Sequence, residues 1–226
     1  GINSLGSLNI NGTAQNPVRF TSVNNFALAG DWGHLSLNNN SNSINYLIYE
    51  YANSGISGDY VSNTTIDHCV IKDISPSQNG LYFTNSTNLT FTNNEISGNG
   101  AYGIYSPNAT NSNISNNTIR GAFTQAAIML DYAGNSSINY NKMPDHSSRG
   151  IMAYYASNLQ INHNQMNVLN NGIETGNSDN NVITYNQISD FISFGIYFYE
   201  STNNQINNNH LTTIINSDLQ YIYGIF

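Results

Sequence analysis

Residues 103–119 read GIYSPNATNSNISNNTI, and this stretch decides the fold. It opens on a small residue followed by an aliphatic one, Gly103-Ile104, and its apolar residues then alternate with Asn, Ser and Thr in short runs. Alternation of this kind is typical of β-strands, whereas an amphipathic helix repeats every 3.6 residues or so, about 100° per residue. The stretch therefore predicts short strands joined by tight polar turns.

The same opening pair recurs along the chain at intervals of 25, 23, 24, 23, 22 and 23 residues. Three further positions recur at a fixed distance from the first residue of each pair. The residues eleven and sixteen positions later are apolar in all seven units, and the residue fourteen positions later is asparagine in six of the seven. Such self-similarity is typical of repeat architectures. The opening pairs are Gly55-Ile56, Gly80-Leu81, Gly103-Ile104, Ala127-Ile128, Gly150-Ile151, Gly172-Ile173 and Gly195-Ile196.

A unit of this length, with three strands and three turns, matches one rung of a parallel β-solenoid, whose strands pair with those of the next rung about 4.8 Å away. We therefore predict a single all-β parallel β-helix domain over residues 1–226. Residues 1–54 are expected to form irregular rungs, 55–211 seven regular rungs, and 212–226 a loop and the start of a further rung. Neither end shows a polar cap, so we expect a longer polypeptide or end-to-end stacking on other subunits.

The asparagine column is expected to point into the coil. Asparagine tolerates a left-handed backbone at a tight bend, and its amide both donates and accepts hydrogen bonds. Stacked at rung spacing, these amides can form a ladder. Cys69 holds the first position of the column and is expected to be a small buried side chain. The predicted ladder comprises Asn94, Asn117, Asn141, Asn164, Asn186 and Asn209.

Composition excludes several classes of protein. Only 8% of the 226 residues are charged, and five basic against thirteen acidic residues give a formal charge of −8, which excludes the basic stripe of a nucleic-acid binder. One cysteine excludes a disulfide scaffold, and no apolar run approaches the roughly 18 residues of a membrane helix. His68 and His163 are about 19 Å apart, four rungs, so they cannot share an ion. No metal and no cofactor are expected.

The phrases Ile114-Ser-Asn-Asn117-Thr-Ile119 and Ile183-Thr-Tyr-Asn186-Gln-Ile188 resemble the right-handed parallel β-helix superfamily of pectate-lyase-like and periplasmic copper-maturation proteins. The stretch Gly12–Ser22, followed by Gly30-Asp31-Trp32-Gly33, is similar to the opening rungs of modules in large secreted surface proteins of bacteria and methanogenic archaea, including a disaggregatase-like group. This resemblance implies a right-handed coil, a secreted or cell-surface location and a carbohydrate partner.

One strand face is rich in tyrosine. If the first residue after each opening glycine points inward, the second and fourth point outward and form one flat face. Tyrosine rings beside carboxylates are suited to stacking on sugars, and they equally suit a contact with a neighbouring subunit. The expected binding residues are Tyr82, Tyr105, Tyr154, Tyr197 and Tyr199.

The same face offers the chain's best candidates for catalysis. Asp131 and Glu174 lie two rungs apart and two residues out of register, so their backbones are about 12 Å apart in space. Side chains that lean towards each other can therefore reach the carboxyl separation of an inverting glycosidase. Tyr154 is expected directly beside Asp131, and the turn before it holds His146 and Arg149, a set suited to a lyase.

Two functions remain open at this point. The first is a structural or adhesive β-helix module of an extracellular cell-surface, fibre or matrix protein, contacting a polysaccharide or neighbouring subunits through the tyrosine face. The alternative is a polysaccharide hydrolase or lyase acting through Asp131, Tyr154, Glu174, His146 and Arg149. The scarcity of catalytic charges favours the first, and the net charge disfavours a polyanionic substrate unless a local basic patch exists.

Overall fold

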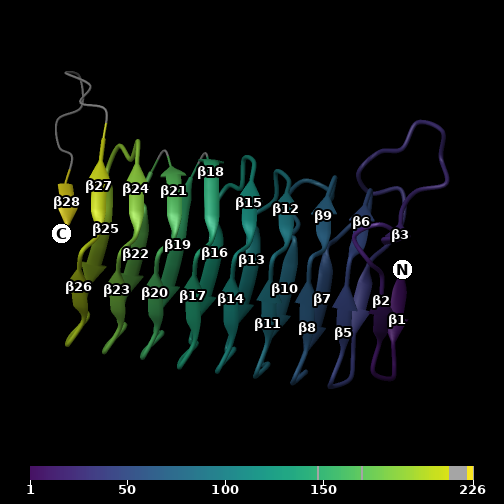
Figure 1. The fold of residues 1–226 in the computed structure, drawn as a ribbon, viewed down its shortest axis with the longest axis horizontal. Helices are drawn as coiled ribbons and strands as arrows, with labels where there is room; N and C mark the ends of the chain where they lie inside the picture. The colour runs from purple at the N-terminus through teal and green to yellow at the C-terminus, as the bar shows by residue number, and fades with distance from the viewer. Residues whose placement is uncertain (147, 169, 214–222, 226) are drawn as a thin grey trace.

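The computed structural model describes residues 1–146, 148–168, 170–213 and 223–225, and for His146 and Tyr223 the backbone only. The chain coils from one end to the other as a β-solenoid, with successive rungs side by side (Figure 1). Within the described residues, the strands form three parallel sheets of ten, nine and nine strands, here sheets A, B and C. The same residues contain no helix with the length and apolar character that spanning a bilayer requires.

Each rung contributes one strand to each sheet, in the order A, B, C along the chain. Sheet A consists of β1 (Ile2–Ser4), β4 (Leu35–Leu37), β7 (Ile56–Asp59), β10 (Leu81–Thr84), β13 (Tyr102–Pro107), β16 (Ala126–Asp131), β19 (Arg149–Tyr154), β22 (Ile173–Gly176), β25 (Phe194–Tyr199) and β28 (Tyr223–Ile225). Sheet B consists of β2 (Asn9–Asn11), β5 (Ser43–Asn45), β8 (Thr65–Asp67), β11 (Thr90–Thr92), β14 (Asn113–Ser115), β17 (Ser137–Asn139), β20 (Gln160–Asn162), β23 (Val182–Thr184) and β26 (Gln205–Asn207).

Sheet C consists of β3 (Val18–Phe20), β6 (Leu47–Glu50), β9 (Val70–Lys72), β12 (Glu95–Ser97), β15 (Thr118–Arg120), β18 (Lys142–His146), β21 (Gln165–Val168), β24 (Gln187–Ser189) and β27 (His210–Thr212). The repeat columns of the sequence coincide with the register of these sheets. For example, Ile104 pairs with Ile128, and Ile114 pairs with Ile138. All four of these isoleucines are fully buried, so the apolar columns form the core inside the coil.

The asparagines fourteen residues after the opening glycines form a hydrogen-bonded row inside the coil. The side-chain Nδ2 of Asn94 donates to Oδ1 of Asn117 at 3.0 Å, and the same bond repeats from each asparagine to the next as far as Asn209. At the first position, where Cys69 replaces asparagine, the backbone N–H donates to Oδ1 of Asn94. Burial raises the pKa of the Cys69 thiol to about 11, so the thiol stays protonated.

The sequence predicts a left-handed backbone at the ladder asparagines, but none of the six has a positive φ. The left-handed backbone belongs to the residue before each of them, such as Asn116 (φ 57°) or Tyr140 (φ 58°). The ladder residues are free to turn their amides inward because their neighbours take the bend. The column with positive φ beside the ladder is His68, Asn93, Asn116, Tyr140, His163, Tyr185 and Asn208.

Glycine opens most units because the rungs approach too closely there for a side chain. A Cβ added to Gly172 would lie 2.4 Å from the Ile188 side chain and 2.5 Å from the carbonyl oxygen of Gly195 in the next rung. Contacts this short cannot form without moving the backbone. The glycine column is therefore a packing requirement of the coil.

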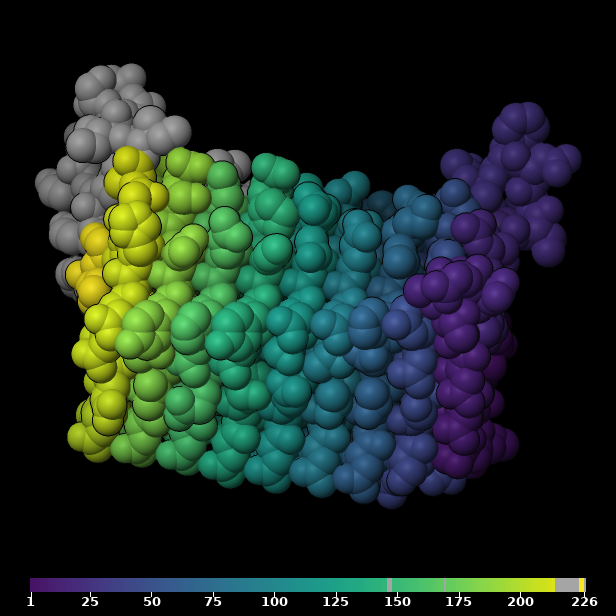
Figure 2. All heavy atoms as spheres, viewed as in Figure 1, coloured from purple at the N-terminus to yellow at the C-terminus, as the bar shows by residue number. Residues whose placement is uncertain are grey.

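Residues 1–54 contribute six strands. The first three, β1–β3, pair with β4–β6, which in turn pair with β7–β9 of the next rung. The chain bends between β5 and β6 at Tyr46, which has a left-handed backbone (φ 52°). A loop over residues 21–31 projects from the body of the solenoid (Figure 2). Most of the segment 212–226, for which a loop and the start of a further rung are expected, lies outside the described residues, namely 214–222 and 226.

Asp31 organises the projecting loop. Its Oδ2 accepts hydrogen bonds from the Ser22 hydroxyl (2.6 Å), the Asn24 amide (2.8 Å) and the Leu28 backbone N–H (3.1 Å). These bonds, chiefly those from Ser22 and Asn24, lower the pKa of Asp31. Near the loop tip, Phe26 is 90% exposed, which makes its peptide bond available to chymotrypsin.

We expect Asp31→Ala to speed chymotrypsin cleavage at Phe26 by about three- to tenfold at neutral pH, because the loop loses its three anchoring bonds. A lowered folded-state pKa means that Asp31 orders the loop fully above its unfolded pKa and loses that effect as pH falls through the folded value. Protection of the Leu28 amide from hydrogen exchange should accordingly decline in acid. Asp59→Ala, an exposed aspartate elsewhere, is the control and should leave cleavage unchanged.

Candidate functional site

The outward side chains of sheet A are not uniformly exposed, as a flat face would require. Met129 and Met152 point away from the core, yet they are only 4% and 5% exposed. With Ala126 they form a second, separate apolar cluster on the outside of the coil. The tyrosines that pack against this cluster are Tyr102, Tyr105 and Tyr154.

Aromatic rings lie on both sides of this outer cluster. Towards the N-terminal end, the ring centroid of Tyr105 is 5.4 Å from Tyr82 and 4.7 Å from Tyr102. Towards the C-terminal end, Tyr199 is 5.9 Å from Tyr154 and 5.7 Å from Tyr197. We call the combined surface the aromatic face: Tyr82, Tyr102, Tyr105, Tyr154, Phe194, Tyr197 and Tyr199.

A glycine shapes the C-terminal part of the aromatic face. Gly176 pairs with Tyr199 in the next rung, and a Cβ at Gly176 would lie 2.0 Å from Cζ of the Tyr199 ring. The ring therefore occupies the space where a side chain at this position would stand. This arrangement lets Tyr199 approach Tyr154 across the intervening rung.

Glu174 is the buried centre of the polar groups on sheet A. It is 6% exposed, and its Oε2 accepts hydrogen bonds from Nε of Arg149 (2.7 Å) and Nδ2 of Asn171 (2.7 Å). Its Oε1 accepts the hydroxyl of Tyr154. Burial, and next the hydrogen bond to this carboxylate, raise the pKa of Tyr154, so the phenol stays protonated as a donor. Glu174 thus fixes an arginine and a tyrosine of the face.

Asp131 is the second acid of sheet A. It pairs in register with Tyr154, as its sequence position predicts. Partial burial raises its pKa, against the opposing effect of a hydrogen bond from the Tyr132 backbone N–H. The ion pairs of the described residues do not include Asp131. Asp131 therefore offers an open carboxylate beside the rings, whereas the carboxylate of Glu174 is occupied.

The register also fixes the separation of the two acids. Asp131 lies opposite Tyr154, and Tyr154 lies opposite Gly176, two residues after Glu174. This is the offset of two rungs and two residues, or about 12 Å between backbones. Since the Glu174 carboxylate is held by its three donors, it is not free to lean towards Asp131.

Arg149 contributes donors to the face. Its Nε is bound to Glu174, and no described residue accepts a hydrogen bond from its two Nη groups. The side chain of His146, the remaining candidate from the sequence, lies outside what the structure describes. Across the described residues, no group of three or more His, Cys, Asp or Glu side chains is placed to hold a metal ion.

The structure therefore brings Arg149, Tyr154 and Glu174 together and sets Asp131 beside them. Sequence reasoning missed Tyr102, Asn171 and Phe194. All three stand directly before the opening glycine of their units, in the same column as Arg149. Reading that column as a third outward row would have found them, because the longer strands of this region, such as β13, begin one residue earlier than the glycine.

Comparison with known proteins gives a family model and several solved structures. The model described as right handed beta helix region matches residues 3–108 and, in a second overlapping match, residues 54–211. No curated protein sequence matches the chain. The similar solved structures reported next share only 14% sequence identity with this chain, so they show a shared fold alone.

Three of these structures illustrate the range. One is the enzymatically active domain of tailspike protein 2 of bacteriophage CBA120, with 14% identity, a TM-score of 0.68, and coverage of 87% of this chain and 36% of that one. The A-module of mannuronan C-5 epimerase AlgE4 of Azotobacter vinelandii has 14% identity, a TM-score of 0.62, and coverage of 99% and 76%. An alginate lyase of Paenibacillus sp. has 14% identity, a TM-score of 0.53, and coverage of 95% and 89%. The chain thus spans about a third of the tailspike domain.

Proposed function

This chain belongs to the right-handed β-helix family, and from that premise we propose that it is a non-catalytic module of an extracellular or cell-surface protein whose aromatic face binds a polysaccharide. The module has a structural or adhesive role, and the bound glycan or a neighbouring copy is its partner. The similar structures include proteins named for mannuronan, for alginate or for a phage tailspike, and these names are in keeping with a carbohydrate partner.

The observation that carries the proposal is the row of rings on sheet A. From Tyr82 on β10 to Tyr197 on β25 there are five rung steps, or about 24 Å, which is long enough for several sugar units. The apolar face of a pyranose stacks on tyrosine, while its hydroxyls need donors and acceptors. The Nη groups of Arg149 and the carboxylate of Asp131 supply both kinds within the row.

The state of Glu174 supports binding over catalysis. A general base needs a lone pair that can reach the substrate. Both oxygens of Glu174 already accept hydrogen bonds, and the side chain is nearly inaccessible. A lyase needs a cation to neutralise a uronate, but Arg149 is already paired with Glu174. These groups are better suited to holding the face rigid.

One observation favours the alternative, a polysaccharide hydrolase or lyase. Burial raises the pKa of Asp131, and a raised carboxyl pKa is a common property of general acids. In that case Asp131 would donate a proton to the departing sugar oxygen. Its second catalytic partner would have to come from Tyr154, His146 or Arg149, because Glu174 is occupied.

Binding to a panel of bacterial, archaeal and plant polysaccharides, followed by affinity electrophoresis, tests the proposal. We expect Tyr82→Ala and Tyr197→Ala each to weaken binding about three- to tenfold, the range for one lost stacking contact. Tyr60→Asn is the matched control, because Tyr60 is an exposed tyrosine outside the face and asparagine takes its turn position in other rungs, as at Asn85.

The same mixtures distinguish the two functions when reducing ends and the absorbance of unsaturated uronates are followed. Binding without turnover supports the module. Turnover by the wild type that is abolished in Asp131→Asn would show that the chain is an enzyme and would overturn the proposal of a non-catalytic module. If both tyrosine variants bind polysaccharide as the wild type does, the aromatic face is not the binding surface, whether the chain is a binding module or an enzyme.

A further inference from the structure

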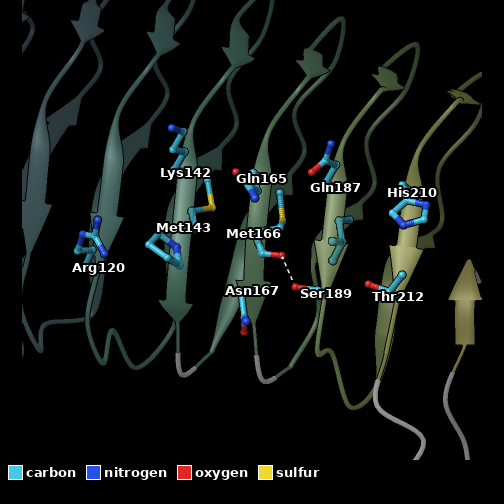
Figure 3. A pocket seen from close by; sticks show the side chains of 12 residues that line it. Arg120, Lys142, Met143, Gln165, Met166, Asn167, Gln187, Ser189, His210 and Thr212 are labelled. Atoms are coloured by element: carbon cyan, nitrogen blue, oxygen red, sulfur yellow. Dashed lines mark hydrogen bonds between the residues drawn. The ribbon is translucent and has the colours of Figure 1, made fainter.

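A second surface with different chemistry lies on sheet C. Its outward residues on successive strands are in register: Lys142 pairs with Gln165, Gln165 with Gln187, and Gln187 with His210. Figure 3 shows these four side chains in one row, with Arg120 at one end of the same face. They line a hollow of about 420 Å³. Its lining includes no aspartate or glutamate.

An irregular strand shapes this hollow. The pairing of β18 with β21 shifts register between Met143 and His146. Pro144 lies in this interval and lines the hollow. Proline lacks the N–H that would continue the ladder of hydrogen bonds, and a strand bends where its ladder is broken. The face is therefore indented at this point instead of flat.

The two cations of the hollow differ from the other three of the chain. Arg19 and Lys72 form ion pairs with the buried Glu50, and Arg149 forms one with Glu174. Arg120 and Lys142 form no ion pair with any described residue, and both side chains are exposed. Two unpaired positive charges thus stand on adjacent strands of a chain whose net charge is −8.

A second hollow continues the first across the turn between sheets B and C. It has a volume of about 340 Å³ and shares Lys142, Gln165 and Gln187 with the first. Its outer wall carries the stacked rings of Tyr140, His163 and Tyr185, with centroids 4.8 and 4.9 Å apart. Because these rings stack face to face, their polar edges are directed to solvent, at intervals of one rung.

We propose that this surface, here the basic groove, is a second glycan site that takes an anionic polysaccharide whose acidic groups meet Arg120 and Lys142. The amides of Gln165 and Gln187 and the hydroxyl of Thr212 pair with sugar hydroxyls along the same row. The Asn167 amide is already bound to the carboxylate of Asp190, at 2.6 Å. Charge-assisted hydrogen bonds to the acidic groups supply most of the affinity. The inference does not depend on the aromatic face, which lies on another sheet.

The neutral side chains argue for a sugar over other polyanions. A nucleic-acid site would extend its cations along the backbone, and rings would offer their faces for base stacking. Here the cations are confined to one end of the groove, and the ring faces cover one another. A sugar acid, which alternates charge with hydroxyl groups, fits a row that begins with cations and continues with amides.

Calorimetric titration tests the basic groove with a linear oligouronate, a sulfated oligosaccharide of the same length and a neutral oligoglucoside. We expect Arg120→Gln and Lys142→Gln each to weaken binding of an anionic oligosaccharide about tenfold, the usual effect of losing one hydrogen bond to a charged group. Gln165→Glu should weaken it by a similar factor, because it adds a like charge without removing a cation. Binding to the wild type should also weaken as salt is added.

Arg19→Gln is the matched control: it is the same substitution at an exposed position of sheet C, on β3 at the far end of the solenoid. An equal loss in this variant, or no loss in Arg120→Gln and Lys142→Gln, would overturn the basic groove. So would equal binding of the neutral oligoglucoside or of a single-stranded oligonucleotide. Tyr60→Asn, a change at an exposed tyrosine that belongs to neither surface, should leave this binding intact.

Discussion

Replacing Asn141 by alanine is expected to lower the free energy of unfolding by about 3–5 kcal/mol, an unusually large effect for one side chain. Asn141 is fully buried. Its Oδ1 accepts from the backbone N–H and the amide of Asn117, and its Nδ2 donates to the Ile114 carbonyl and to Asn164. Alanine would leave all four partners without these bonds in a site that water cannot enter. Urea unfolding measures the loss.

The control for this prediction lies at the end of the same row. Asn209 is only half-buried, so water can replace part of what alanine removes, and Asn209→Ala is expected to cost about 1–2 kcal/mol. Cys69, at the other end, is already a natural exception to the asparagine column. Equal losses at Asn141 and Asn209, or a loss below about 1 kcal/mol at Asn141, would contradict a ladder that stabilises the coil.

The fold was predictable because each rung repeats the same physical requirements. The pairing of Ile114 with Ile138, for instance, follows from the sequence column alone, since strands of a parallel coil stack in register. The conformation of single turn residues was not predictable to the same extent. A left-handed backbone was assigned to asparagine on propensity, but Tyr140 and His163 also adopt it, where their rings stack on each other.

The sequence predicted where the residues of the candidate site lie, but not how exposed they are or which hydrogen bonds they form. Period-two alternation placed Tyr105, Tyr154 and Glu174 on one face, because alternation reports direction. Exposure depends on how side chains lean across neighbouring rungs, so the burial of Met129 and the occupation of Glu174 by Arg149 could not follow from spacing. Hydrogen bonds between rungs join residues that are more than twenty positions apart, and no local pattern specifies them.

The scarcity of charge in the sequence acquires a specific meaning in the structure. Three of the five basic residues are paired with the two buried glutamates, Glu50 and Glu174. A buried carboxylate requires such partners, so the positive charge of these three residues is already compensated. Arg149 keeps only its Nη groups, which can still donate hydrogen bonds to sugar hydroxyls. The local basic patch that the sequence left open is formed by the remaining two, Arg120 and Lys142, on a different sheet from the tyrosines.

Removing the carboxylate of Glu174 is the change expected to affect the aromatic face most. Glu174→Ala should lower the free energy of unfolding by about 2–4 kcal/mol, less than for a fully buried pair because the side chain of Arg149 is 27% exposed and partly solvated. It also releases Arg149 and Tyr154 from their positions. Polysaccharide binding by the folded variant should therefore weaken about tenfold, as expected when a site loses its preorganisation.

Glu174→Gln separates the charge from the shape of this side chain. Glutamine keeps an oxygen for the Tyr154 hydroxyl but loses the ion pair with Arg149, so it should destabilise less than alanine and restore part of the binding. Glu95→Ala is the control, because Glu95 is an exposed strand glutamate without an ion pair among the described residues, and its effect should stay within about 0.5 kcal/mol. If Glu174→Ala unfolds like Glu95→Ala and binds like the wild type, Glu174 does not organise the face. If the loss instead appears only in turnover, with binding retained, Glu174 acts in catalysis and the module reading fails.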